Sequence, residues 1–260
     1  MIKTIDEDLK LEIAYNPKYK DRIPVDKITI LFVPGMGTMG RFSRKMLRVK
    51  NFFERRGLDM NIAHFVYKSH QQNTISDLEN DVYDIEKAVN SLEKFEIPRE
   101  KIGLCGLCYG SYVISKYLNQ DNNIKFAIFF DPYLGINSFT KSTRITLNTI
   151  GKGIKKMINL FGIKKIYIGN RYTNNPGYLD LNSFWDNVCN DIILKRRDIP
   201  ILGINTGYHS FIDRNVVERF FKKNNFEYYF ISEMCINNKI NKIVQCNIYN
   251  TIARFIKKNI

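Results

Sequence analysis

Short apolar runs alternate with segments of helical periodicity along most of the chain, and this alternation constrains the fold more than any other feature. The run KITILFV (27–33) is nearly continuous in apolar residues and stops at Pro34-Gly35, which is typical of a buried strand. Further strands are expected at 9–15, 60–67, 101–106, 124–130, 198–205 and 226–232. Helices are expected at 44–57, 75–95, 111–118, 215–224 and 248–258. The pattern predicts an α/β fold, with a mostly parallel sheet and helices on both faces.

The segment 133–190 interrupts this alternation. We therefore expect a core formed by residues 1–132 and 191–260, with 133–190 as a basic, partly amphipathic lid or cap insert. Five apolar residues of the insert share one helical face, and three lysines lie away from it: Ile150, Ile154, Met157, Ile158 and Phe161; Lys152, Lys155 and Lys156. Three interpretations stay open: a surface helix that covers the core, a lid whose apolar underside meets an acyl chain, or a peripheral membrane helix.

The chain carries a formal net charge of +14, which by itself suggests a nucleic-acid partner. We expect no nucleic acid, because Ile, Asn and Lys are used heavily throughout and much of the charge is then solvated lysine. The segment Pro132–Tyr178 is different, since it contains eight basic residues and no Asp or Glu. This local asymmetry indicates an anionic partner or a membrane-facing surface.

Several classes of protein are not expected. The sequence has no uninterrupted apolar stretch of about 18 residues, and the start MIKTIDEDLKLEI has no apolar core of a signal peptide. Five cysteines, an odd number, show no disulfide framework, so we expect a reducing, cytoplasmic location. No second CxxC and no paired histidine spacing accompany Cys105 and Cys108, so neither a metal nor a cofactor is predicted.

The stretch GLCYGS (106–111) lies between a predicted strand and a predicted helix. A G-x-C-x-G turn in this setting presents the central side chain on a strained backbone, with glycines where larger residues would collide. The turn also places Cys108 at a helix N-terminus, which favours a thiolate and predicts a lowered pKa. A redox pair of Cys105 and Cys108 is the alternative, but Cys105 falls inside the strand and is expected to face the core.

In this order of elements the chain resembles the α/β-hydrolase superfamily. The resemblance rests on FVPGMG (32–37), KSHQQN (68–73), GLCYGS, ILGINTGYHSFID (201–213) and the closing NTIARFI. The cysteine in the turn resembles that of dienelactone hydrolases, polyhydroxyalkanoate synthases and some acyl-transfer relatives. The resemblance implies that Cys108 is a nucleophile. It also implies that the backbone N–H groups of Met36 and Tyr109 form an oxyanion hole.

The resemblance also implies a basic histidine after the last strand, but that loop reads ISEMCINNKINK, with Cys235 near the expected position. The three histidines are His64 in a strand, His70 in a turn where the superfamily has a structural histidine, and His209 in the loop after 198–205. Three interpretations remain. His209 is the base from an unusual position, the chain binds without turnover, or Cys108 works without a histidine. The orienting acid is Asp131 or, alternatively, Asp213, which also suits a helix cap.

Together these residues predict an acyl-transfer enzyme, a hydrolase, thioesterase or acyltransferase, that acts on an ester or thioester through an acyl-Cys108 intermediate. The predicted catalytic residues are Cys108, His209 and Asp131. The basic insert favours a small-molecule acyl substrate carried on an anionic phosphopantetheine or coenzyme A. The alternatives are a catalytically inactive binding protein of the same fold and a peripheral membrane protein that uses the insert.

Overall fold

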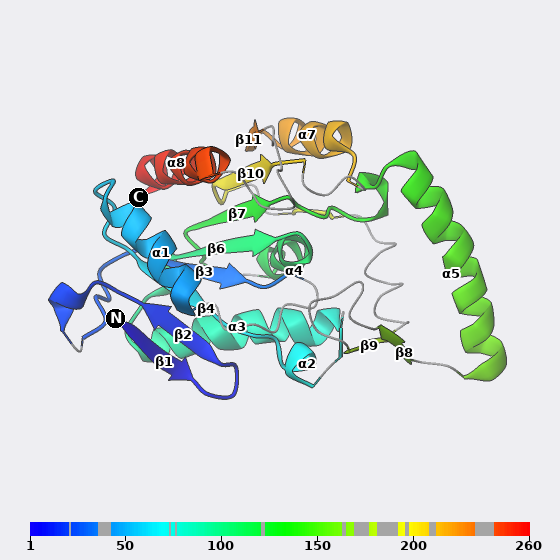
Figure 1. Cartoon of the computed structure of the whole chain (residues 1–260), viewed down its shortest axis with the longest axis horizontal. Coiled ribbons are helices and arrows are strands. Elements are labelled where there is room, and N and C mark those ends of the chain that lie inside the picture. Colours follow the sequence, from blue (N-terminus) through cyan, green and yellow to red (C-terminus); the bar gives the residue numbers. More distant parts are fainter. Residues whose placement is uncertain are drawn as a thin grey trace.

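The structure is a computed structural model of the whole chain (Figure 1). It describes residues 1–20, 22–35, 43–72, 74–75, 77–120, 123–162, 165–168, 177–180, 192–195, 198–207, 212–231 and 242–260. Its centre is an eight-stranded sheet of order β1-β2-β4-β3-β6-β7-β10-β11. The strands are β1 (Ile2–Asp6), β2 (Leu11–Ala14), β3 (Thr29–Val33), β4 (Asn61–His64), β6 (Ile102–Leu107), β7 (Phe126–Phe130), β10 (Ile201–Asn205) and β11 (Glu227–Phe230).

The sheet is mostly parallel. Strands β4, β3, β6, β7, β10 and β11 run in the same direction, and β1 and β2 add an antiparallel edge. The carboxyl ends of β3, β6, β7 and β10 therefore meet at one edge of the sheet, where ligands bind in open α/β sheets. The predicted Cys108 and Asp131 directly follow β6 and β7 at this edge.

Helices cover both faces of the sheet, as Figure 1 shows. On one face α1 (Ser43–Glu54) and α8 (Lys242–Asn259) pack on a core that includes Phe53, Ile62 and Ile252. On the other face α3 (Leu78–Lys94), α4 (Tyr109–Leu118) and α7 (Arg214–Lys223) enclose a larger core. Both faces of the central strands are thus buried, which explains why their sequences are continuously apolar.

The predicted strands and helices are confirmed, with shifted ends. Helix α3 starts later than the predicted 75–95, with Asp77 as its N-cap, whose side chain accepts from the Asn80 N–H. The sequence interpretation did not include β1, the short helix α2 (Lys68–Gln71) or the small sheet β5-β9-β8. Its strands are β5 (Thr74–Ile75), β8 (Lys165–Ile168) and β9 (Gly177–Asp180).

The expected insert contains α5 (Lys141–Phe161), β8 and β9. Strand β9 pairs with β5, which precedes α3, and this pairing joins the insert to the core. Helix α5 stands away from the main sheet in Figure 1, and Ile145 and Ile150 are 58% and 50% exposed. Among the residues that the structure describes, no helix has the length and hydropathy needed to cross a membrane.

Candidate active site

The turn between β6 and α4 places Cys108 in a strained backbone conformation, with φ 51° and ψ −111°. Glycines make this turn sterically feasible. A Cβ on Gly110 would lie 2.5 Å from the Val33 carbonyl oxygen, and one on Gly106 would lie 2.6 Å from the Ser111 nitrogen. These neighbours are backbone atoms that cannot move aside. The glycine spacing of GLCYGS is therefore explained by the close approach of β3 and α4 to the turn.

Hydrogen bonds hold the turn in place. The Cys108 N–H donates to the Phe130 carbonyl at 2.9 Å, and the Ser111 N–H donates to the Cys108 carbonyl at 3.0 Å. The buried Ser111 hydroxyl donates to the Gly106 carbonyl at 2.7 Å. The strained residue is thus fixed by both neighbouring elements, which is the condition under which backbone strain persists.

The Cys108 side chain is half-buried. Burial raises the pKa of its thiol to about 11, the Tyr109 N–H that faces the sulfur opposes this rise, and the Asp131 carboxylate adds to it. The prediction of a lowered pKa is therefore wrong. Desolvation disfavours the thiolate more than the helix N-terminus favours it. A Cys108 thiol in this environment needs a base to become nucleophilic at neutral pH.

Asp131 is buried and follows β7 with φ 41°, a left-handed conformation that aspartate tolerates. Its Oδ1 accepts from the Thr206 N–H and its Oδ2 accepts from the Thr206 hydroxyl, both at 2.6 Å. The Asp131 N–H donates to the Ile204 carbonyl at 2.7 Å. The carboxylate is therefore anchored at the end of β10, where the loop that carries His209 begins, and it interacts electrostatically with Cys108.

Tyr109, the residue after Cys108, is buried and extends toward α3. Its hydroxyl donates to Asp81 Oδ2 at 3.0 Å, and the Ser69 hydroxyl donates to Asp81 Oδ1 at 2.5 Å. Burial raises the pKa of Asp81 to about 8. The sequence analysis did not identify Asp81 as a candidate site residue. The signal for a buried role was the spacing of Asp81 and Asp84 with Ile85 and Ala88 on the apolar face of α3.

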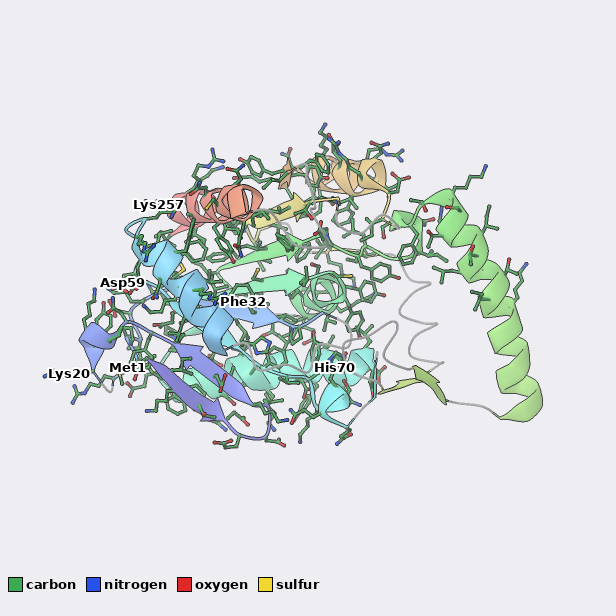
Figure 2. The ribbon with its side chains drawn as sticks, viewed as in Figure 1. Met1, Lys20, Phe32, Asp59, His70 and Lys257 are labelled. Carbon is green, nitrogen blue, oxygen red and sulfur yellow. The ribbon has the colours of Figure 1, made fainter. Side chains whose placement is uncertain are left out.

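The histidines occupy different places. His64 lies in β4 and is buried, and burial lowers its pKa to about 4. His70 lies in α2, is buried, and packs edge-on against the Tyr67 ring with centroids 5.0 Å apart; Figure 2 shows it beside α3. The predicted base His209, the predicted oxyanion donor Met36 and Cys235 lie outside the described residues.

Two further candidates have structural roles. Asp213 caps α7, because its Oδ1 accepts from the N–H groups of Asn215 and Val216. Cys105 is 5% exposed inside β6, as expected, which disfavours a redox pair with Cys108. In the part of the chain that the structure describes, His, Cys, Asp and Glu form no cluster able to hold a metal ion.

Similar proteins were found among solved structures, and the similarity lies in the fold. No protein-family model and no curated protein sequence matches the chain. Among solved structures, DcsB in complex with its substrate analogue is similar with a TM-score of 0.64, 12% identity and 90% of each chain covered. The α/β hydrolase GrgF from a Penicillium species has a TM-score of 0.63 and 13% identity, over 96% of this chain and 93% of its own.

A soluble variant of monoglyceride lipase from Saccharomyces cerevisiae, in complex with a substrate analogue, has a TM-score of 0.60 and 11% identity. The similarity covers 96% of this chain and 91% of that one. At such low identities the similarity concerns the fold. The mostly parallel sheet, the strand order and the strained turn after β6 define an α/β-hydrolase fold. The expected resemblance to dienelactone hydrolases stays a prediction.

Proposed function

We propose that the protein is an acyl-transfer enzyme of the α/β-hydrolase type, with Cys108 as its nucleophile. The observation that carries this proposal is the conformation of Cys108, a non-glycine residue with φ 51° fixed between a strand and a helix by two close glycines. Strain of this kind, anchored from both sides, supports a role for the side chain that the turn presents.

In the proposed reaction the Cys108 sulfur attacks the carbonyl carbon of a thioester or ester. A new C–S bond forms, the bond to the leaving thiol or alcohol breaks, and the proton of Cys108 passes through a base to the leaving group. Water or another acceptor then releases the acyl group by the reverse sequence, and the proton returns to Cys108. Exchange of one thioester for another needs little driving force, since one thiolate replaces another.

The raised pKa of Cys108 makes a base more important than the sequence alone suggested. We propose His209 for this role, because Asp131 is bonded to Thr206 three residues before it and interacts electrostatically with Cys108. The backbone N–H groups of Tyr109 and Met36 would hold the developing oxyanion. The Tyr109 N–H already faces the sulfur.

The acyl carrier is proposed to be anionic, such as a phosphopantetheine or coenzyme A thioester. The support is the segment Pro132–Tyr178, which has eight basic residues and no acidic ones. Helix α5 presents part of this charge, since Lys141 and Lys152 are exposed. Electrostatic attraction would raise the local concentration of such a substrate, and this contribution falls with ionic strength.

Release of free thiol from a panel of acyl-coenzyme A and acyl-pantetheine thioesters tests the proposal. Wild type should release thiol, and Cys108→Ala and His209→Ala should lose most of the rate with unchanged thermal unfolding. Cys246→Ala, at an exposed cysteine of α8, is the matched control and should keep the wild-type rate. No thiol release from any thioester of the panel would favour the inactive binding protein. A normal rate in His209→Ala would make His70→Ala the next variant.

A second candidate function is attachment to an anionic membrane through α5. The observation that favours it is the exposure of Ile145 and Ile150 on a basic helix that stands away from the main sheet. Vesicles with and without phosphatidylglycerol test it by flotation. Binding only to the anionic vesicles, lost in Ile145→Asp/Ile150→Asp, would support it, and no binding to either would contradict it.

A further inference from the structure

Tyr109 is held at two points, by the strained turn at its backbone and by α3 at the tip of its side chain. Its N–H faces the Cys108 sulfur, and its hydroxyl donates to Asp81 Oδ2 at 3.0 Å. The ring between them is buried and stacks on the ring of Tyr112, with centroids 6.4 Å apart. Because the backbone and the ring belong to one residue, the place of the hydroxyl constrains the direction of the N–H.

Asp81 is itself fixed by a second hydrogen bond. It is fully buried in α3, and its Oδ1 accepts from the Ser69 hydroxyl of α2 at 2.5 Å. Helix α2, which lies beside α3 in Figure 1, is joined to it once more, because the Lys68 N–H donates to Asp84 Oδ2 at 2.6 Å. The acceptor for the Tyr109 hydroxyl thus lies on a helix that is tied to its neighbour at two points.

Joining two helices through a buried carboxyl group has a large desolvation cost. Burial raises the pKa of Asp81 to about 8, so at pH 7 most of the folded protein holds this group uncharged. Apolar side chains of similar volume would pack α3 on α4 without that cost. A hydrogen-bonded chain adds direction, since donor and acceptor fix the places of the groups that they join. The chain from Ser69 through Asp81 to Tyr109 therefore suits the fixing of a position better than the stabilisation of a contact.

A second tyrosine of α4 makes the same kind of bond away from the turn. Tyr117 lies near the other end of the helix, and its hydroxyl donates to Glu86 Oε2 of α3 at 2.8 Å. Glu86 is partly exposed and also pairs with Arg99 at 2.6 Å. This bond joins the same two helices without touching the residue that faces the sulfur, so it provides a comparison within the molecule.

We propose that Asp81 is a positioning residue for the Cys108 site, and that it acts through the Tyr109 hydroxyl to hold the Tyr109 N–H against the sulfur. The same N–H is the proposed oxyanion donor, so the catalytic consequence rests on the proposed acyl transfer. The effect on the thiol does not rest on that function, because an N–H that faces the sulfur stabilises the thiolate whatever the substrate.

Alkylation of Cys108 by iodoacetamide at pH 7 tests the positioning without acyl chemistry. Tyr109→Phe and Asp81→Ala should each slow alkylation of the Cys108 peptide by about threefold or more, because the thiolate loses its aligned N–H. Asp81→Asn keeps a side-chain oxygen that accepts from the Tyr109 hydroxyl, and it is uncharged, as Asp81 largely is at this pH. It should therefore recover most of the rate. The peptide of the exposed Cys246 is the internal reference.

Tyr117→Phe is the matched control, because it removes the same hydroxyl from the same pair of helices and should leave Cys108 alkylation unchanged. The double variant Tyr109→Phe/Asp81→Ala should be no slower than either single variant, since both changes break one chain. Tyr109→Phe keeps the buried ring and gives the result if Asp81→Ala does not fold.

Two outcomes would overturn the proposal. The first is a folded Tyr109→Phe whose Cys108 reacts at the wild-type rate or faster, because a helix that merely loosens would expose the sulfur. The second is equal slowing in Tyr117→Phe, which would make the effect a general consequence of weaker packing between α3 and α4.

Turnover separates this proposal from the proposed function. With thioesters that the wild type cleaves, Tyr109→Phe and Asp81→Ala should lower kcat by about tenfold and leave KM nearly unchanged, because the N–H acts on the charge that develops in the transition state. If the wild type cleaves no thioester but Cys108 alkylation slows as expected, the proposed function fails and the positioning role stands. If turnover requires Cys108 but alkylation is unchanged in Tyr109→Phe, the positioning role alone fails.

Discussion

The carboxylate of Asp131 is bonded twice to Thr206, through the backbone N–H and through the hydroxyl, both at 2.6 Å. This pair joins the carboxyl ends of β7 and β10 at the edge of the sheet that presents Cys108. It determines where the Asp131 charge sits, close enough to influence the Cys108 thiol. The two hydrogen bonds to Thr206 hold Asp131, the predicted acid, in a defined position.

Thr206→Val should destabilise the fold, because Asp131 Oδ2 then loses its hydroxyl donor in a buried site. We expect a decrease of about 1–3 kcal/mol in the free energy of unfolding, measured by urea denaturation. Thr206→Ser keeps the hydroxyl and should recover most of the loss. Equal destabilisation by the two variants would show that the hydroxyl bond is unimportant.

Gly110→Ala should be strongly destabilising. Its Cβ would lie 2.5 Å and 2.7 Å from the carbonyl oxygens of Val33 and Pro34, which are backbone atoms of the neighbouring β3 segment. Such overpacking costs roughly 1–3 kcal/mol. The matched control is Gly153→Ala in α5, where a Cβ meets nothing within 4 Å. That variant should gain ~0.5–1 kcal/mol, because alanine favours a helix. A thermal-unfolding series in which Gly110→Ala behaves like Gly153→Ala would contradict this account of the turn.

Asp81→Asn should change how stability depends on pH. The pKa of Asp81 is raised from 3.8 to about 8, so the folded state holds this proton more tightly than the unfolded chain. Its contribution to stability is therefore complete below about pH 4 and is lost as the pH rises to about 8, with a slope of at most ~1.4 kcal/mol per pH unit.

Asparagine does not titrate, so the difference in the free energy of unfolding between wild type and Asp81→Asn should shift in favour of the variant between pH 4 and 8. Above pH 8 it should level off. Asp84, with a pKa of about 6, titrates in the same range and adds to the rise at Asp81, so Asp84→Asn and the double variant complete the comparison. Urea denaturation at each pH measures it, and a difference that stays constant from pH 4 to 9 would refute the assignment.

The reactivity of Cys108 toward iodoacetamide should follow its raised pKa of about 11. The alkylation rate, followed on the peptide that contains Cys108, should rise about tenfold per pH unit from pH 7 to 10, since only the thiolate reacts. Cys108→Ala identifies the peptide signal. A rate that is already at its plateau at pH 7 would show that Cys108 is a thiolate at this pH, as the helix N-terminus alone predicts. It would contradict the raised pKa.

Much of the fold could be predicted from the sequence because the central strands are buried on both faces and read as apolar runs. KITILFV is β3, and the glycines of GLCYGS surround the strained residue. The half-exposed edge strand β1 and the two-residue β5 give no such signal. The local sequence thus predicts the strands and helices whose burial shows as a pattern of apolar residues. It does not predict strands that form only because they pair with a distant segment of the chain.

For Cys108 and Asp131, the place in the fold could be predicted from the sequence, but the charge state of Cys108 could not. The two residues follow β6 and β7, which pair in parallel in the structure, so both lie at the same edge of the sheet. The pKa of Cys108 depends on how deeply neighbouring elements bury it, and no local motif encodes that. The Tyr109–Asp81 bond joins residues 28 positions apart on two helices, so it too required the tertiary structure.

Intact-mass measurement after incubation with acyl thioesters, followed by peptide mapping, tests the central claim most directly. The account predicts one acyl group on wild type, located on the peptide with Cys108, no adduct on Cys108→Ala, and an unchanged adduct on Cys246→Ala. An acyl group that persists in Cys108→Ala, or its absence from the wild type across the whole panel, would contradict the role of Cys108 as nucleophile.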